Sequence, residues 1–258
     1  MPKKNGRKDQ IIELTLERGI VSVGELAEKL GVSAQTVRRD INQLCSDNLL
    51  RRRHGGVERF EQPLNTPYNE RTITNPDYKH AIADAVAQMV PDGSSIFISI
   101  GSTPTMVAAA LKGKKNLTVM TNNLNAAMAL SEEATNRIIL PGGELRLPDR
   151  DILGDDVTSF FDDYRAEFGV FGVAGVAADG ALLDFHASEV RVREKIRMNC
   201  KTSVLVVDST KFGRDAPAVG GSIFDVDRII MDKHQNDDYI PLLKRVEDRL
   251  VIVGDNAT

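Results

Sequence analysis

The stretch Ser33-Ala-Gln-Thr-Val-Arg-Arg-Asp-Ile41 decides how the first part of this chain folds. Its apolar positions recur at helical spacing, which predicts a helix with one buried face. That face comprises Ala34, Val37, Ile41 and, one turn further on, Leu44. Ser33 stands just before the pattern, where its hydroxyl can accept a hydrogen bond from a free backbone N–H of the first turn. A capped amphipathic helix is therefore predicted from residue 34 onward.

The polar face of this helix carries the side-chain types that read DNA. Glutamine and asparagine amides pair with adenine, arginine forks onto guanine, and arginine or threonine holds a phosphate. A face that is only solvated usually carries more glutamate and lysine and fewer amides. We therefore predict that the following residues contact DNA: Ser33, Gln35, Thr36, Arg38, Arg39 and Asn42.

Two shorter helical patterns precede this helix. Apolar residues between positions 11 and 16 predict the first. Ser22, with Glu25 three residues later, predicts a reciprocal cap at the start of the second. Gly31 supplies the sharp turn into the third helix. Two helices joined by a tight turn predict a helix-turn-helix, which places its second helix in the major groove of DNA.

A basic segment follows the predicted recognition helix. Residues 49–57 read L-L-R-R-R-H-G-G-V, and this pattern predicts a β-hairpin, the wing of a winged helix-turn-helix. A basic run by itself is usually solvated surface, but this position favours contact with DNA phosphates. We expect those contacts from Arg51, Arg52 and Arg53. His54 is not expected to bind a metal, because no second ligand lies nearby in the sequence.

Composition and charge agree with two modules that have different partners. Hydrophobic residues make up 41% of the chain and charged residues 27%, as is ordinary for a globular protein. Residues 1–60 hold 12 Lys/Arg and 8 Asp/Glu, whereas residues 61–258 hold 21 and 29. A basic head on an acidic body indicates two separate partners, although any division of a chain leaves some asymmetry.

The sequence also excludes several classes of protein. Cys45 and Cys200 are too far apart to indicate a metal motif or a disulfide framework. No apolar run approaches the roughly 20 residues that span a bilayer, and acidic residues interrupt the segment after the basic N-terminus, unlike in a signal peptide. We expect a soluble, cytoplasmic protein with no metal, no cofactor and no membrane partner.

A polar stretch with three prolines divides the two modules. Pro63, Pro67 and Pro76 argue against a long regular element there. We predict a winged helix-turn-helix DNA-binding domain at residues 1–58, a linker at residues 59–78, and an effector-binding domain at residues 79–258.

Beyond the linker, apolar runs of strand length alternate with helical patterns. This alternation predicts the α/β class, with a larger, mostly parallel sheet covered by helices on both faces. Such sheets bind ligands in loops at the carboxyl ends of their strands. The predicted strands span residues 95–100, 117–120, 137–140, 168–173, 203–207 and 228–231.

The first strand-end loop is the strongest candidate for binding a phosphate. Gly101 permits close approach of the backbone, and Ser102 and Thr103 offer hydroxyl groups. The helix whose first turn holds Pro104 has free N–H groups that attract an anion. A plain strand-to-helix turn with a capping hydroxyl is the alternative. No Gly-Lys-Ser/Thr run is present, which argues against an ATP-type phosphate loop.

Three further strand ends carry polar residues at corresponding places. Each alone is as typical of an ordinary turn as of a site, but in succession they favour one shared ligand site. They contribute Thr121, Asn122 and Asn123, then Gly142, Gly143, Glu144 and Arg146, and finally Lys211.

Taken together, these segments resemble the DeoR-type bacterial regulators. In the head the likeness rests on residues 33–41 followed by His54-Gly-Gly. In the body it rests on G-S-T-P, T-N-N-L-N, G-G-E-L-R, L-L-D-F-H-A-S-E-V-R and V-D-S-T-K-F-G-R, so it covers nearly the whole chain. The resemblance implies a body related in fold to ribose-5-phosphate isomerase.

The resemblance also implies roles for particular residues. Thr36, Arg38 and Arg39 would contact DNA, and Asp40 would orient an arginine. The effector site would be lined by Ser102, Thr103, Asn122, Gly143, Glu144 and Lys211. The implied function is a transcription regulator that represses a carbohydrate or glycerol catabolic operon. A small phosphorylated effector, glycerol 3-phosphate or a different sugar phosphate, would relieve repression, and a dimer or tetramer would bind double-stranded operator DNA.

Two other functions stay open at this point. Isomerisation of a sugar phosphate needs a carboxylate base and a cation, which Glu189 or Asp184 with Lys211 could supply. However, Gly172-Val-Ala-Gly175 replaces the acidic cluster typical of the isomerases, so we expect no catalytic residue and no enzyme. Alternatively, the body could serve only to oligomerise a DNA-binding protein that has no ligand.

Overall fold

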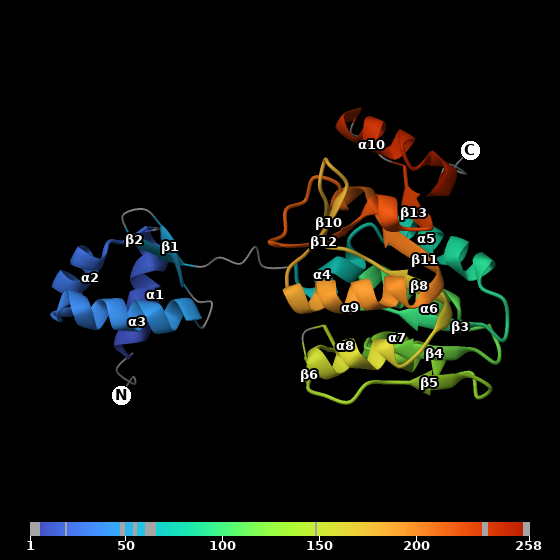
Figure 1. Cartoon of the computed structure of the whole chain (residues 1–258), viewed down its shortest axis with the longest axis horizontal. Coiled ribbons are helices and arrows are strands. Elements are labelled where there is room, and N and C mark those ends of the chain that lie inside the picture. Colours follow the sequence, from blue (N-terminus) through green and yellow to red (C-terminus); the bar gives the residue numbers. More distant parts are fainter. Residues whose placement is uncertain are drawn as a thin grey trace. The chain divides into compact units, whose positions relative to one another are not determined.

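The chain forms two compact units, Met1–Gln62 and Pro63–Thr258, which we call the head and the body. Both appear in Figure 1. The computed structural model describes residues 6–18, 20–46, 50–53, 56–59, 66–147, 149–233 and 237–254. Each unit has its own buried apolar cluster, and the body holds two.

The head begins with a helix-turn-helix, as predicted. Its helices are α1 (Arg7–Arg18), α2 (Val23–Leu30) and α3 (Ala34–Ser46). The reciprocal cap of α2 is present: the Glu25 N–H donates to Ser22 Oγ over 3.2 Å, and the Ser22 N–H donates to Glu25 Oε2 over 2.8 Å. Gly31 ends α2 with a φ of 63°, the left-handed conformation that glycine adopts without strain.

A β-hairpin follows, in the place of the predicted wing. Its strands β1 (Leu50–Arg53) and β2 (Gly56–Arg59) pair antiparallel. Val57 exchanges backbone hydrogen bonds of 2.8 and 2.9 Å with Val21, which ties the hairpin to the segment before α2. A Cβ on Gly56 would lie 2.4 Å from the Val21 carbonyl oxygen, so this approach needs glycine. His54 lies outside the described residues.

A seven-stranded sheet, parallel throughout, forms the centre of the body. The strand order is β14-β13-β11-β8-β3-β4-β5. The strands are β3 (Ser95–Ile98), β4 (Thr118–Thr121), β5 (Arg137–Ile139), β8 (Ala166–Phe171), β11 (Cys200–Val207), β13 (Arg228–Asp232) and β14 (Leu250–Val253). The α/β prediction is confirmed, with β14 as an additional edge strand. The order reverses between β3 and β8, where sheets of this kind bind ligands.

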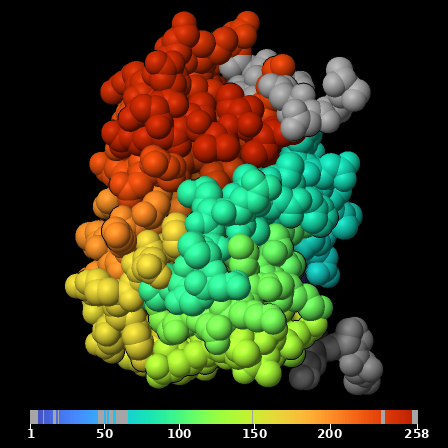
Figure 2. Space-filling model, turned by 90° about the vertical axis from the view of Figure 1, so that its right-hand side faces the viewer, coloured from blue at the N-terminus to red at the C-terminus, as the bar shows by residue number. Residues whose placement is uncertain are grey.

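Alternate residues of β3 face the two apolar clusters of the body. Ile96 and Ile98 belong to the cluster covered by α5 to α7, whereas Phe97 belongs to the cluster covered by α8 to α10. These helices are α5 (Pro76–Met89), α6 (Ser102–Ala110), α7 (Leu124–Leu130), α8 (Asp155–Asp162), α9 (Ala187–Met198) and α10 (Ile240–Lys244). Helix α5 also packs against β13 and β14, so the first and last parts of the body lie side by side (Figure 2).

Shorter elements complete the body. They are helix α4 (Tyr68–Ile73), the hairpin β6 (Leu145–Arg146) with β7 (Asp151–Ile152), and a small sheet of β9 (Gly175–Val176), β10 (Ala181–Asp184) and β12 (Ala218–Ser222). Part of the stretch predicted as linker is helical, because it contains α4 and the first turn of α5. Pro76 is tolerated in that turn, where its missing N–H would have no partner within the helix.

Candidate functional site

One side of α3 forms an open hollow on the surface of the head. All six residues predicted on the polar face of α3 line it, and Arg7 and Asp40 join them. Ser33 Oγ accepts the Thr36 N–H over 3.2 Å, as the predicted cap requires. Val37 and Ile41 are buried on the opposite face of the helix. The helix therefore presents amides, hydroxyls and guanidinium groups together on one exposed surface.

Asp40 fixes an arginine that the sequence analysis did not include. Arg7 Nε donates to Asp40 Oδ2 over 2.5 Å and Arg7 Nη2 donates to Oδ1 over 3.2 Å. The hydrogen bond from Arg7 lowers the pKa of the buried Asp40 carboxyl, so the carboxyl stays ionised. Arg7 thus stands beside the polar face of α3. The sequence feature that could have indicated Arg7 was the basic segment at the N-terminus.

The β1–β2 hairpin contacts α3 through one of its arginines. Arg52 is exposed and its Nη2 donates to Asn42 Oδ1, so two residues predicted to contact DNA bind each other. The side chains of Arg51 and Arg53 lie outside the described residues.

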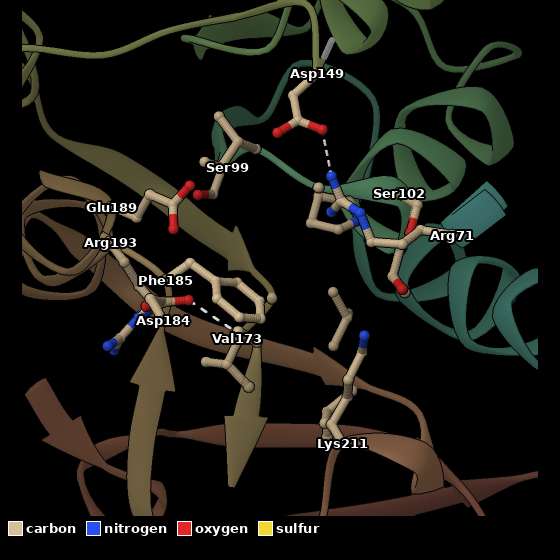
Figure 3. Close-up of a pocket in the computed structure, with 18 of the residues that line it drawn as sticks. Arg71, Ser99, Ser102, Asp149, Val173, Asp184, Phe185, Glu189, Arg193 and Lys211 are labelled. Carbon is tan, nitrogen blue, oxygen red and sulfur yellow. Dashed lines mark hydrogen bonds and ion pairs between the residues drawn. The ribbon is translucent and has the colours of Figure 1, made fainter. Parts of the chain in front are cut away.

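The body holds a pocket at the carboxyl ends of β3, β8 and β11, beside the point where the strand order reverses. Residues from α4, the β6–β7 hairpin, β10 and α9 close its sides (Figure 3). Of the residues predicted to bind an effector, the pocket brings together Gly101, Ser102, Thr103, Arg146 and Lys211.

The other predicted effector residues do not line this pocket. They are Thr121, Asn122, Asn123, Gly142, Gly143 and Glu144. The polar side chains after β4 turn to the backbone instead: Thr121 Oγ1 donates to the Ile98 carbonyl over 2.6 Å. Asn123 caps α7 by accepting the Ala126 N–H over 3.2 Å. Thr121 and Asn123 therefore stabilise the backbone around the site and do not form its surface. Gly142, Gly143 and Glu144 are exposed.

One end of the pocket is rich in cations. Lys211, Arg71 and Arg214 line it, and Lys79 is buried behind it with Nζ donating to the Arg71 carbonyl. Burial, together with the neighbouring cations, lowers the pKa of Lys211 to about 8, against the opposing effect of Asp208. Positive charge held in a poorly solvated place is favourable for binding an anion.

The α6 N-terminus opens at the same end. Gly101 takes a φ of 117° just before the helix, and Ser102 and Thr103 are both buried in its first turn. The first N–H groups of a helix have no partner within it, and the helix dipole adds partial positive charge there. Hydroxyls, backbone donors and cations therefore surround one volume.

The other end of the pocket combines carboxylates with arginines (Figure 3). Arg146 binds both oxygens of Asp151 over 2.8 and 2.7 Å and Glu189 Oε1 over 3.0 Å. Arg193, which is buried, donates through Nε to Asp184 over 2.9 Å. Burial raises the pKa of Asp184 to about 6, while Arg193 opposes the shift. Such a network offers donors and acceptors to the hydroxyl groups of a ligand.

Several residues of the pocket were missed from the sequence as binding residues. Arg71, Asp149, Asp151, Phe185, Arg193 and Arg214 line it, and Glu189 and Asp184 were considered only for isomerase chemistry. Arg71, Phe185 and Arg193 do not follow a predicted strand of the main sheet, so the rule that located the site did not reach them. Asp149, Asp151 and Arg214 do lie in such connections, but several residues beyond the strand ends. Among the described residues, no three His, Cys, Asp or Glu side chains are grouped as a metal site would require.

Comparisons with known proteins match both units. A model of the DeoR-like helix-turn-helix domain matches residues 7–63, and a model of the DeoR C-terminal sensor domain matches residues 74–233. The glycerol-3-phosphate regulon repressor of Escherichia coli (strain K12) is 44% identical over 89% of this chain and 91% of its own. The HTH-type transcriptional repressor CsqR of the same organism is 38% identical over 89% of this chain and 88% of its own.

Solved structures match part of the chain. Ribose 5-phosphate isomerase A from Methanocaldococcus jannaschii has a TM-score of 0.39 and 17% identity, with 54% of this chain and 55% of the isomerase covered.

Proposed function

Because the chain belongs to the DeoR family, and is a DNA-binding transcription regulator rather than an enzyme, we propose that it represses a carbohydrate or glycerol catabolic operon until glycerol 3-phosphate binds the pocket of the body. The observation that carries this proposal is the cationic end of the pocket beside the α6 N-terminus. The name of the E. coli relative supports the choice of effector.

The two ends of the pocket suit the two ends of such an effector. The phosphate accepts hydrogen bonds from the first turn of α6, at Ser102 and Thr103, and faces the ammonium group of Lys211. The hydroxyls of the glycerol part face the network of Arg146 and Glu189. A sugar phosphate with more hydroxyl groups is the alternative effector, and the thermal unfolding experiment described below distinguishes the two.

The head binds operator DNA through α3 and the wing. In this proposal the polar face of α3 reads base edges and phosphates in the major groove, and the wing arginines contact the adjacent backbone. The proposed contacts are Ser33, Gln35, Thr36, Arg38, Arg39 and Asn42 in α3, with Arg51, Arg52 and Arg53 in the wing. A dimer or tetramer of this chain supplies two heads to a palindromic or repeated operator.

Thermal unfolding of the body tests the effector. Glycerol 3-phosphate at about 100 times its dissociation constant should stabilise the protein by roughly 2.7 kcal/mol. Glycerol, inorganic phosphate and glucose 6-phosphate serve as comparison ligands. A larger increase in thermal stability with glucose 6-phosphate would make a sugar phosphate the effector in place of glycerol 3-phosphate. No increase with any phosphate would contradict a sensor role for the body.

Lys211→Ala is the variant that tests the proposed phosphate contact. Loss of one charged hydrogen bond should weaken glycerol 3-phosphate binding by about 1.5–3 kcal/mol, with operator binding unchanged. Lys201→Ala, which removes an exposed lysine at the opposite end of β11, is the matched control. Isothermal titration measures the effector, and fluorescence anisotropy measures the operator. Weaker operator binding by Lys211→Ala would contradict its assignment to the sensor.

A further inference from the structure

Arg71 joins three parts of the body that surround the pocket. Its Nη2 donates to Asp149 Oδ1 in the turn between β6 and β7, and its Nε donates to the Thr66 carbonyl over 2.8 Å. Its own carbonyl accepts a hydrogen bond from Lys79 Nζ in α5. Arg71 also lines the cationic end of the pocket. One guanidinium group is therefore shared between the binding site and the segment that carries it.

That segment is the first described part of the body after the head. The head ends at Gln62 and α4 begins at Tyr68, so α4 is the first described helix of the body after the DNA-binding unit. The structure describes every residue of α4, and none of them is buried. An element with few buried contacts is at the low end of local stability. Apolar packing therefore holds α4 less firmly than it holds the helices that cover the sheet.

Polar contacts with the pocket hold α4 in its place. Besides the Arg71–Asp149 ion pair, the Tyr68 hydroxyl donates to Thr105 Oγ1 in α6 over 3.0 Å, and Arg214 Nη2 donates to Thr66 Oγ1 over 3.3 Å. Thr105 and Arg214 belong to the elements that form the cationic end. The position of α4 consequently depends on the same groups that an anion in the pocket would attract.

The ion pair between Arg71 and Asp149 is exposed to competition from such an anion. The Arg71 side chain is 13% exposed and that of Asp149 is 17% exposed, so the pair is poorly screened by water. In Figure 3 Arg71 stands between Asp149 and the cavity that Ser102 and Lys211 also face. A phosphate there attracts the guanidinium and repels the Asp149 carboxylate. Arg146, 3.2 Å from Asp149, remains to hold that carboxylate.

We propose that Arg71 is an effector-binding residue. When the phosphate of the effector binds Arg71, it breaks the Arg71–Asp149 ion pair and α4 moves. This movement lowers the affinity of the head for DNA. The inference rests on the proposed function for the identity of the pocket as the effector site. It assigns the Arg71–Asp149 ion pair to the state with high operator affinity. It also makes α4 the element that couples the pocket to the linker.

Two variants of the ion pair test the inference. Both should lower the affinity for operator DNA, but they should change the affinity for the effector in opposite directions. Asp149→Asn and Arg71→Gln each remove the ion pair and keep a polar, uncharged side chain at the position. Without effector, both should lower operator affinity by roughly 5- to 100-fold, the usual range of coupling between sites. Asp149→Asn should bind glycerol 3-phosphate more tightly than wild type, since the competing carboxylate is gone. Arg71→Gln should bind it about tenfold more weakly.

The control and the contrary outcomes are defined by the same assays. Asp155→Asn removes an exposed carboxylate that pairs with Arg191 on the surface, and it should change neither affinity. Wild-type operator affinity in both variants of the ion pair would overturn the inference, as would effector affinities that change in the same direction. If wild type does not bind glycerol 3-phosphate or glucose 6-phosphate, the proposed function fails, and the operator assay without effector still decides whether the ion pair controls the head.

Discussion

The head and the body present their candidate sites in different ways. In the head, the residues proposed to contact DNA lie on one face of one helix and in the hairpin that follows it. In the body, the pocket is assembled from α4, α6, α9, the β6–β7 hairpin, β10 and the ends of three strands. A site on a single element can therefore be predicted from sequence periodicity, whereas an assembled site depends on tertiary structure.

The largest expected effect tests whether the two units are stable independently. Phe97 is fully buried in β3 and makes an edge contact with Phe161, their ring centroids being 5.3 Å apart. Phe97→Ala should therefore destabilise the body by about 3–5 kcal/mol through lost contacts and a cavity. Urea unfolding measures the loss, and hydrogen exchange of α3 amides should stay as in wild type. Leu147→Ala, at an exposed leucine, is the control. Loss of protection in α3 would show that the head depends on the body.

A smaller effect is expected from the surface of the head. Arg38→Ala should weaken operator binding by about 1–3 kcal/mol if the guanidinium reads a base. Effector binding should not change, because the residue belongs to the other unit. Arg137→Ala, at an exposed arginine of β5, controls for the loss of one positive charge. Fluorescence anisotropy at one fixed salt concentration is the measurement, and equal affinities of the two variants would remove Arg38 from the proposed contacts.

The pH dependence of the two units should also differ. The pKa of Lys211 is lowered to about 8, mainly by burial, so the empty pocket loses this charge as pH rises through that value. Effector affinity should fall above pH 8 by up to about tenfold per pH unit, while operator affinity should stay constant between pH 7 and 9. The stability of the empty body should change with pH in the opposite direction. The unfolded chain binds more protons between about pH 8 and the ordinary pKa of 10.5, so stability rises with pH in that window.

Lys211→Ala is the control for this titration, because it should remove the fall in effector affinity above pH 8. Calorimetric titrations between pH 7 and 9, above the second pKa of a phosphate monoester at about 6, provide the measurement. An identical pH profile in the variant would assign the titration to another group.

The smallest expected effect concerns a helix cap in the head. Ser22→Ala removes the hydroxyl that accepts the Glu25 N–H, which should cost about 1 kcal/mol of head stability. The body should unfold as in wild type. Ser159→Ala, at an exposed serine within α8 of the body, is the matched control. Denaturant unfolding followed by amide signals of α2 distinguishes the units, and a change confined to the body would contradict the division between them.

The sequence predicted the parts of the fold that depend on local patterns. The cap at Ser22, the turn at Gly31 and the buried face of α3 follow from spacing within a few residues, and the structure has each of them. The parallel sheet followed from alternation of strand and helix patterns. The edge strand β14 was missed because Leu250–Val253 is short and directly follows a charged turn.

The pocket shows where such reasoning stops. Asn123 follows a strand, as a ligand-binding residue would, yet its side chain caps α7 and donates to the Ser99 carbonyl. Conversely, Arg71 precedes the first strand of the body and reaches the pocket only because α4 lies against α6 and the β6–β7 turn. Neither outcome is determined by neighbouring residues in the sequence. Asn123 binds backbone groups that tertiary packing leaves unpaired, and Arg71 binds a side chain that tertiary packing brings beside α4.

The low burial of α4 has a consequence for how a regulator of this kind can evolve. Its outward positions, among them the 76% exposed Ile73, contribute little to the free energy of unfolding, so substitutions there should stay within about 0.5 kcal/mol. Mutation can therefore explore this helix without risking an unfolded protein. The strength of a response to metabolite levels could be tuned there, separately from both the choice of ligand and the choice of operator.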